Sequence, residues 1–404
     1  MTQPDLALRP VPHRPADPQP TFRSLFPALR EKTYLSICDK MILAHPVRAG
    51  VDRFLDKLAH AGASRVDHEV LVESGREKFA RLVNAAPASI AVMRNVSDGI
   101  NALAWAFPLR EGDNIVIATG AEHPNNIYPW LRQQERGVEL RVVASPDGRI
   151  DPKTMIAAAD ARTRIVTAAS VSFSPGYRTD LQALGEFCRP KDIFLLVDGV
   201  QSAGILHHDF AAEPIDGFAT STSKGLLGLY GYGFTYVAPR WIDRMKPVYL
   251  SRTGIALDND DASAMGGLDY ALKPDARRFE LGSYNLAGAY AADAALDLLL
   301  GIGTKTIETH VLGLAEALRQ GLGALGLSLS LPEDTTERAH IVTCGQLDNG
   351  GHGFSHDPSI TELYRRLTQA GVTLTLRRGQ LRFGLHYYND LSDIERVLDI
   401  IATG

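Results

Sequence analysis

The chain has 404 residues, of which 45% are hydrophobic and 22% charged, a composition typical of a folded protein with a substantial core and two domains. Lys and Arg number 42 against 47 Asp and Glu, and this net charge of -5 gives no electrostatic reason to expect a nucleic acid or membrane partner. Three scattered cysteines are too few for a disulfide framework, and no apolar run suits a signal peptide or membrane helix, so we expect a cytoplasmic protein that acts on a small molecule.

The first half of the chain alternates strand and helix patterns. Proline is frequent over residues 1–30, which predicts an extended arm without regular structure. Amphipathic helices are predicted over 66–82 and 181–188. Short apolar, β-branched runs predict strands at 90–93, 114–118, 140–143, 165–169, 193–197, 217–220 and 233–237. Together they indicate an α/β fold of three layers, with a mainly parallel sheet and an active site at the carboxyl ends of its strands.

The pattern changes after about residue 303. The C-terminal part predicts helices at 306–325, 360–370 and 394–401, and strands near Ser328, Ile341, Thr373 and Leu381. We therefore expect a smaller α+β domain over 303–404, after a large domain over 31–302 whose first residues could pack on the small one. The segment 251–275 includes an acidic, small-residue loop to which we assign no role.

Lys224 is the only charged residue between Asp216 and Arg240. A lysine in such a glycine-rich, apolar segment is partly desolvated, which lowers the pKa of its amine and frees it for Schiff-base chemistry. The alternative is a lysine whose stem is buried while its head reaches solvent.

A second candidate is Asp198, which the apolar strand 193–197 places at its carboxyl end before a glycine turn. An aspartate facing the pyridine nitrogen of pyridoxal phosphate (PLP) keeps that nitrogen protonated, so that the ring can accept electrons. A carboxylate that only forms a turn is the alternative.

Further candidates follow other predicted strands. His123 comes after strand 114–118 and could stack on a cofactor ring or merely cap the next helix. Arg382 lies in a strand and could hold a substrate carboxylate by two parallel hydrogen bonds, or form a surface ion pair. Hydroxyl groups beside glycines or helix starts could bind phosphate, although a turn or cap explains each: Ser97, Ser221, Ser223 and Ser283.

In this order the segments resemble the class V aminotransferase family of fold-type I PLP enzymes, which includes cysteine desulfurases, isopenicillin N epimerase-like proteins and kynureninases. The resemblance runs from about residue 33 to 401. It is carried by six motifs in order: Asn-Val-Ser-Asp-Gly-Ile-Asn, Glu-His-Pro-Asn-Asn-Ile-Tyr-Pro-Trp, Val-Asp-Gly-Val-Gln-Ser, Ser-Thr-Ser-Lys-Gly-Leu-Leu-Gly, Arg-Phe-Glu-Leu-Gly-Ser and the strand that contains Arg382.

The resemblance implies a role for each candidate. Lys224 would carry PLP as a Schiff base, Asp198 would pair with its pyridine nitrogen, and Arg382 would receive the substrate α-carboxylate. Gln201 would reach the phenolic oxygen and His123 would cover the ring. The phosphate would be surrounded by Val96, Ser97, Ser221 and Ser223, and reached from the neighbouring subunit by Gly282 and Ser283, which implies a homodimer with shared active sites.

Departures from the family pattern bear on the reaction. Cysteine desulfurases need a nucleophilic cysteine on a mobile loop before the carboxylate-binding arginine, but segment 372–382 is short and has none, so we expect no desulfurase activity. Phe173 stands where many relatives have an asparagine beside the phenolic oxygen. Ser223 stands where desulfurases have a histidine, and Cys38 occupies a substrate-side stretch that usually carries small or amide residues.

We therefore expect an aminotransferase in which Lys224 moves the α-proton of an amino acid or amine to the cofactor. A PLP lyase that eliminates a β or γ group, such as one bound through sulfur, and an epimerase-like racemase remain as alternatives. A nicotinamide enzyme is disfavoured because Gly231-Tyr-Gly233 leads into a strand instead of opening a helix. We expect no metal site, since His352 and His356 lie in a glycine-rich loop.

Overall fold

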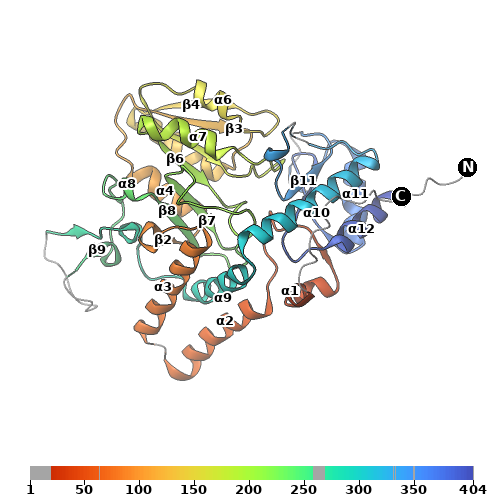
Figure 1. Cartoon of the computed structure of the whole chain (residues 1–404), viewed down its shortest axis with the longest axis horizontal. Coiled ribbons are helices and arrows are strands. Elements are labelled where there is room, and N and C mark those ends of the chain that lie inside the picture. Colours follow the sequence, from red (N-terminus) through yellow and green to blue (C-terminus); the bar gives the residue numbers. More distant parts are fainter. Residues whose placement is uncertain are drawn as a thin grey trace, which may run out of the picture.

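The computed structural model describes residues 20–62, 64–257, 269–330, 332, 334–348 and 351–403. Its centre is a seven-stranded sheet of order β2-β8-β7-β6-β5-β3-β4 (Figure 1). The strands are β2 (Ile90–Met93), β3 (Asn114–Thr119), β4 (Glu139–Ala144), β5 (Thr163–Ala169), β6 (Phe194–Asp198), β7 (Gly217–Ser221) and β8 (Gly233–Val237). Strand β8 runs antiparallel to both of its neighbours, and the other neighbouring strands of this sheet pair parallel. The predicted α/β class with a mainly parallel sheet is confirmed.

Helices surround this sheet. They are α2 (His45–Asp56), α3 (Arg65–Leu82), α4 (Val96–Ala106), α5 (Tyr128–Gln133), α6 (Pro152–Ala157), α7 (Leu181–Cys188), α8 (Pro239–Ile242) and α9 (Leu286–Ile302). Figure 1 shows α6 and α7 near the β3 and β4 end of the sheet, and α3 and α9 near β2. Strands β6, β7 and β8 are buried throughout, which explains their continuously apolar sequences.

A second, three-stranded sheet of order β11-β14-β13 lies in the C-terminal part. Its strands are β11 (Ile341–Cys344), β13 (Thr375–Arg377) and β14 (Gln380–Gly384), and its helices are α10 (Thr304–Ala324), α11 (Pro358–Gln369) and α12 (Leu391–Ala402). The strand predicted near Ser328 is wrong, because only an isolated bridge joins Leu329 to Cys344 there. We propose that the small domain begins where α9 gives way to α10 at Gly303.

Residues 20–30 are not extended as predicted, while residues 1–19 lie outside the described part. They form α1 (Pro20–Ser24) and a 3-10 helix (Pro27–Arg30). Proline is tolerated in the first turn of a helix because that turn's N–H groups have no partner within the helix. The Phe22 ring packs edge-on against Tyr387, 5.2 Å away, so the helical arm is held by the C-terminal part.

Residues 33–41, here called the bridging segment, connect the two sheets. Its strand β1 (Thr33–Tyr34) pairs with β12 (Val372–Thr373) of the C-terminal part. Further along, the Met41 N–H donates to the Ser223 carbonyl at 2.9 Å, on the loop that follows β7. The segment therefore lies where the predicted cofactor and substrate residues meet.

Among the described helices, none is by itself long and apolar enough to cross a membrane; only α9 and α10 meet the length and composition test, as a pair bent by 79°. The segment 251–275 contains a short hairpin of β9 (Ile255–Ala256) and β10 (Ala271–Leu272), while residues 258–268 lie outside the described part.

Candidate active site

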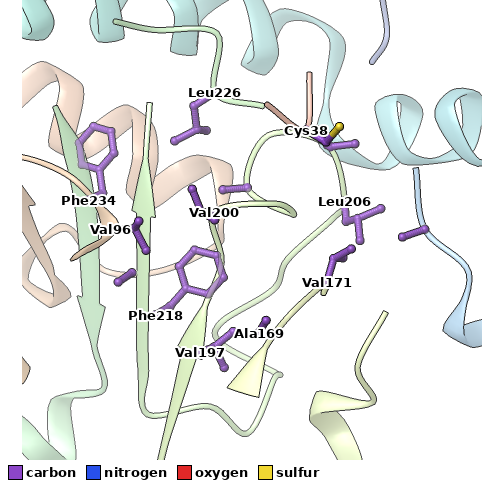
Figure 2. Packing of buried hydrophobic residues seen from close by; sticks show 14 of the residues in the cluster. Cys38, Val96, Ala169, Val171, Val197, Val200, Leu206, Phe218, Leu226 and Phe234 are labelled. Carbon is purple, nitrogen blue, oxygen red and sulfur yellow. The ribbon is translucent and has the colours of Figure 1, made fainter. Parts of the chain in front are cut away.

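Six strands of the central sheet end at one edge, because β2, β3, β4, β5, β6 and β7 run in the same direction. The loops that leave this edge carry the candidates named from the sequence. Figure 2 shows buried apolar side chains around it, among them Val197 from β6, Phe218 from β7 and Cys38 from the bridging segment. The parallel topology thus gathers residues that are far apart in the chain.

Asp198 is the last residue of β6 and its side chain is held in the interior. The residue is 3% exposed, and the Val200 N–H donates to its Oδ1 at 3.0 Å. Burial raises the pKa of this carboxyl to about 6, while the Val200 N–H and the nearby Lys224 amine oppose the rise. The turn that follows requires glycine, because a Cβ on Gly199 would lie 1.8 Å from Cζ of Phe218.

Lys224 lies half-buried in the loop after β7. Desolvation lowers the pKa of its amine, the positive charge of Arg382 lowers it further, and Asp198 raises it. The loop is fixed by backbone contacts on both sides of the lysine: Met41 donates to the Ser223 carbonyl, and His386 Nε2 donates to the Gly225 carbonyl at 2.9 Å. The structure thus places a desolvated amine within electrostatic reach of a buried carboxylate.

His123 caps a helix, which is one of the two alternatives considered for it, while its stacking on a cofactor ring stays a prediction. It is the N-cap of a 3-10 helix (Pro124–Asn126), and its Nδ1 accepts the Asn125 N–H at 3.2 Å. This contact leaves the proton of the neutral ring on Nε2. The ring meets Phe173 edge-on at 5.5 Å, and its pKa is lowered by desolvation and then by Lys224 and two arginines. His123 therefore caps a helix and also faces the group of cations.

The predicted phosphate-binding residues gather around the start of α4. The Val96 N–H donates to Ser221 Oγ at 2.8 Å. Asn95 is the helix cap, since its side chain accepts the Asp98 N–H, and Ser97 lies one residue inside the helix. Ser97 lines a cavity of about 810 Å³ whose wall also includes Gly282 and Ser283. Ser223 is buried beside Lys224.

Arg382 is a buried cation whose side-chain partners in the described part of the chain are neutral. The residue is 2% exposed; its Nε donates to Thr375 Oγ1 at 3.0 Å and its Nη1 to the Phe173 carbonyl. The surface ion pair considered as the alternative is therefore wrong. A guanidinium held in the interior without a carboxylate is poised to receive an anionic ligand.

Cys38 contacts both Gln201 and β14, the strand that contains Arg382. Gln201 Nε2 donates to the Cys38 carbonyl at 3.0 Å, while Gln201 Oε1 is buried without a hydrogen-bond partner. The Cys38 thiol packs against β14, because a Cβ on Gly384 would lie 2.6 Å from its Sγ. Among the described residues, the Gln201 amide oxygen is thus buried and unsatisfied, three residues after the end of β6 at Asp198.

These residues fit PLP. Lys224 would supply an amine for its aldehyde, Asp198 a carboxylate for its ring nitrogen, and the unpaired Gln201 oxygen a partner for a polar ring substituent. The α4 N-terminus, with the Ser97 and Ser221 hydroxyls, offers donors of the kind that bind phosphate.

Glu122 was not assigned a role from the sequence. Its carboxylate is buried, accepts the Ala169 N–H at 2.6 Å and accepts Asn126 Nδ2 at 2.9 Å. Desolvation raises its pKa to about 8, and the charge of Asp198 contributes to the rise. An acidic residue directly before His123, after an apolar strand, was the available signal. Asp39 and Arg377, which also reach the site, were missed as well.

Comparisons with known proteins agree with this geometry. The family model "Aminotransferase class-V" matches residues 55–397. The chain is 30% identical to a probable cysteine desulfurase of Methanothermobacter thermautotrophicus, over 91% of this chain and 94% of the relative. It is 28% identical to the uncharacterized aminotransferase YcbU of Bacillus subtilis, over 94% and 96%.

Solved structures show the same fold. The apo cysteine desulfurase of Thermococcus onnurineus NA1 superposes with a TM-score of 0.81 at 22% identity, covering 97% of this chain and 99% of that one. The cystine C-S lyase C-DES, in complex with cysteine persulfide, gives a TM-score of 0.82 at 21% identity, covering 93% and 99%. The fold-type I architecture expected from the sequence is confirmed.

The position of Lys224 yields a first prediction. Borohydride reduction of the PLP-loaded protein should fix the cofactor on the peptide that contains Lys224, as mass spectrometry can check. Lys224→Ala should lose this adduct and at least about 10²-fold in turnover, because the amine would both bind the cofactor and transfer protons. Lys191→Ala, which alters an exposed lysine over the Phe187 ring, serves as the control and should keep both. An adduct retained in Lys224→Ala would contradict the assignment.

Burial of Glu122 yields a second prediction. Its pKa is raised from 4.5 to about 8, so the folded protein binds this proton more tightly than the unfolded chain does. The resulting stabilisation is complete below about pH 4.5 and is lost as the pH rises through about 8. Thermal unfolding should therefore show a midpoint that falls less between pH 5 and pH 9 in Glu122→Gln than in the wild type. The exposed-residue control Glu77→Gln should keep the wild-type slope; equal slopes in all three proteins would refute the idea.

Proposed function

The chain belongs to the aminotransferase class-V family and its cofactor is PLP, and from this premise we propose that it is an aminotransferase for an amino acid or amine. The observation that supports this most directly is the buried Arg382, without a carboxylate partner among the described residues, beside the desolvated amine of Lys224. A carboxylate receptor next to a proton-transferring amine is the minimum that transamination of an α-amino acid needs.

PLP, when bound, supplies an aldehyde that condenses with amines and a ring that accepts electrons. The residues of this chain would bind and orient the substrate and move its proton. Arg382 binds the substrate α-carboxylate and orients the α-carbon toward Lys224. The Lys224 Nζ, whose pKa is lowered, would take the proton from the substrate α-carbon and deliver it to the carbon that was the cofactor aldehyde. Asp198, buried at the end of β6, would keep the ring nitrogen of the cofactor protonated. The His123 ring would exclude water from one face of that cofactor ring.

A desulfurase function is not proposed, although several relatives carry that name. Strands β13 and β14 are joined only by Arg378 and Gly379, both with positive φ, which is a tight turn without a cysteine. The three cysteines are buried, and burial raises the pKa of the Cys188 and Cys344 thiols to about 12. The remaining one, Cys38, is packed against β14. The described residues therefore offer no exposed thiolate for persulfide chemistry.

A lyase or epimerase is the second candidate, since both begin with the same proton abstraction. The fold neighbour C-DES is a cystine C-S lyase, which favours the lyase among these. In a lyase the carbanion expels a β or γ group, so a keto acid would form without an amino acceptor. An epimerase would return the proton to the other face and release no keto acid.

We also propose a homodimer with shared sites. Exposed apolar side chains lie beside the cavity that Gly282 and Ser283 line: Val248, Tyr249 and Leu281, with Tyr249 75% exposed. Apolar surface of this kind is typical of a protein interface. A second subunit docked there would bring its own residues to the phosphate end of the site. The free, buried cysteines support a cytoplasmic location.

Single-turnover spectroscopy tests the proposed reaction. With a panel of amino acids and no acceptor, the aldehyde form of the cofactor should convert to its amine form, with one equivalent of keto acid and no ammonia or sulfide. An oxo acid should then restore the aldehyde form. Continuous keto acid and ammonia release without acceptor would establish the lyase instead. Cys38→Ser should leave turnover within a few fold, and cysteine-dependent persulfide that vanishes in this variant would overturn the exclusion of a desulfurase.

The subunit interface can be tested separately. Tyr249→Asp should shift the protein toward monomer in analytical ultracentrifugation, because a carboxylate would have to be desolvated in the interface. It should also weaken PLP retention, since the phosphate end of the site is then incomplete. Val142→Asp, which alters an exposed apolar residue of β4, is the control and should remain dimeric. A wild-type monomer that retains PLP would contradict the shared site.

A further inference from the structure

A second arginine faces the same space as Arg382. Arg377 is the last residue of β13, and β13 pairs antiparallel with β14 so that Thr375 is opposite Arg382. Side chains two residues apart on a strand lie on the same face. Arg377 therefore shares a face with Thr375 and Arg382, and the hydrogen bond from Arg382 Nε to Thr375 Oγ1 shows which face this is.

Electrostatic contacts place both arginines at the site. Each lowers the pKa of His123, and the charge of Arg382 also lowers the pKa of Arg377, although desolvation contributes more. Two guanidinium groups, one amine and one imidazole thus converge from β13, β14, the loop after β7 and the loop after β3. The two guanidinium groups, which stay charged, exceed what a single α-carboxylate requires.

Arg377 has one carboxylate partner, and that partner is easily exchanged. Its Nη2 lies 3.0 Å from Asp39 Oδ1, on the bridging segment, and the two side chains are 21% and 32% exposed. Both side chains of this ion pair keep part of their surface in contact with solvent, so water can solvate either charge when the pair opens. Asp39 can therefore return to solvent when another anion approaches Arg377.

We propose that Arg377 is a specificity residue that binds the distal carboxylate of a dicarboxylic amino or oxo acid, while Arg382 holds its α-carboxylate. The inference rests on the proposed function and names the substrate class of that site. Asp39 acts as the resident counterion: it neutralises Arg377 when the substrate side chain is uncharged and gives way to an acidic one. The same pocket can then accept a neutral donor and an acidic acceptor in turn, as a two-substrate aminotransferase requires.

Direct binding to the PLP-loaded enzyme tests this without turnover. Isothermal titration would compare succinate, glutarate and adipate with butyrate, pentanoate and hexanoate. We expect the dicarboxylate of best-fitting length to bind at least about tenfold more tightly than the monocarboxylate of equal length. In Arg377→Gln this preference should disappear while monocarboxylate binding changes less than about twofold. Arg377→Lys should keep part of the preference because it keeps the charge.

Two further variants separate specificity from structure. Asp39→Asn should strengthen dicarboxylate binding, because the competing anion is gone. Arg378→Gln changes the adjacent arginine, which donates to the Gly120 carbonyl, and should keep the wild-type ratio of the two affinities. Equal affinities for both acid classes in the wild type, or equal loss of both in Arg377→Gln, would overturn the proposal.

The outcome is distinguishable from failure of the proposed reaction. If single-turnover transamination fails but the dicarboxylate preference depends on Arg377, the substrate class stands and the reaction type is wrong. If transamination proceeds with neutral and acidic acids alike, and KM for dicarboxylic oxo acids is unchanged in Arg377→Gln, the reaction stands and the role of Arg377 is wrong.

Discussion

The site depends on keeping the Lys224 amine desolvated while a carboxylate stays buried nearby. Neighbouring parallel strands achieve this, since β6 ends at Asp198 and β7 leads into the lysine loop. The two loops approach each other closely at two glycines: a Cβ on Gly204 would lie 2.4 Å from the Gly225 carbonyl oxygen, and one on Gly225 would lie 2.4 Å from the Ala203 oxygen. Any side chain at either position would separate the loops, so their spacing is set by glycine.

The C-terminal part completes this arrangement. His386, from the segment after β14, is buried and donates to the Gly225 carbonyl, which places the proton of the neutral ring on Nε2. Desolvation agrees with this state, since it lowers the pKa of His386 to about 4. The bridging segment holds the other side of the loop through Met41. Lys224 is therefore positioned by three parts of the chain that are remote in sequence.

Sequence reasoning succeeded where a local residue pattern indicates the tertiary surroundings of a segment. Apolar runs identified the buried strands to within two residues, and the charges that interrupt them, Asp198 and Lys224, marked the carboxyl ends. It failed where tertiary packing determines the local structure or the position of a side chain. The helix that contains Phe22 forms because its aromatic face meets Tyr387, a contact that proline counting cannot anticipate. The sequence does not distinguish Arg377 from other arginines in strands. The strand register is what places it on the same face as Arg382.

The positive charges of the site also connect binding with catalysis. After desolvation, the charge of Arg382 is the largest influence that lowers the pKa of Lys224. A carboxylate that binds Arg382 offsets that charge, so the amine becomes a stronger base as the substrate arrives. Before binding, the lowered pKa favours the unprotonated, nucleophilic form of the amine; after binding, the raised proton affinity would favour abstraction of the α-proton. One buried guanidinium can thus orient the substrate and adjust the lysine to the step that follows.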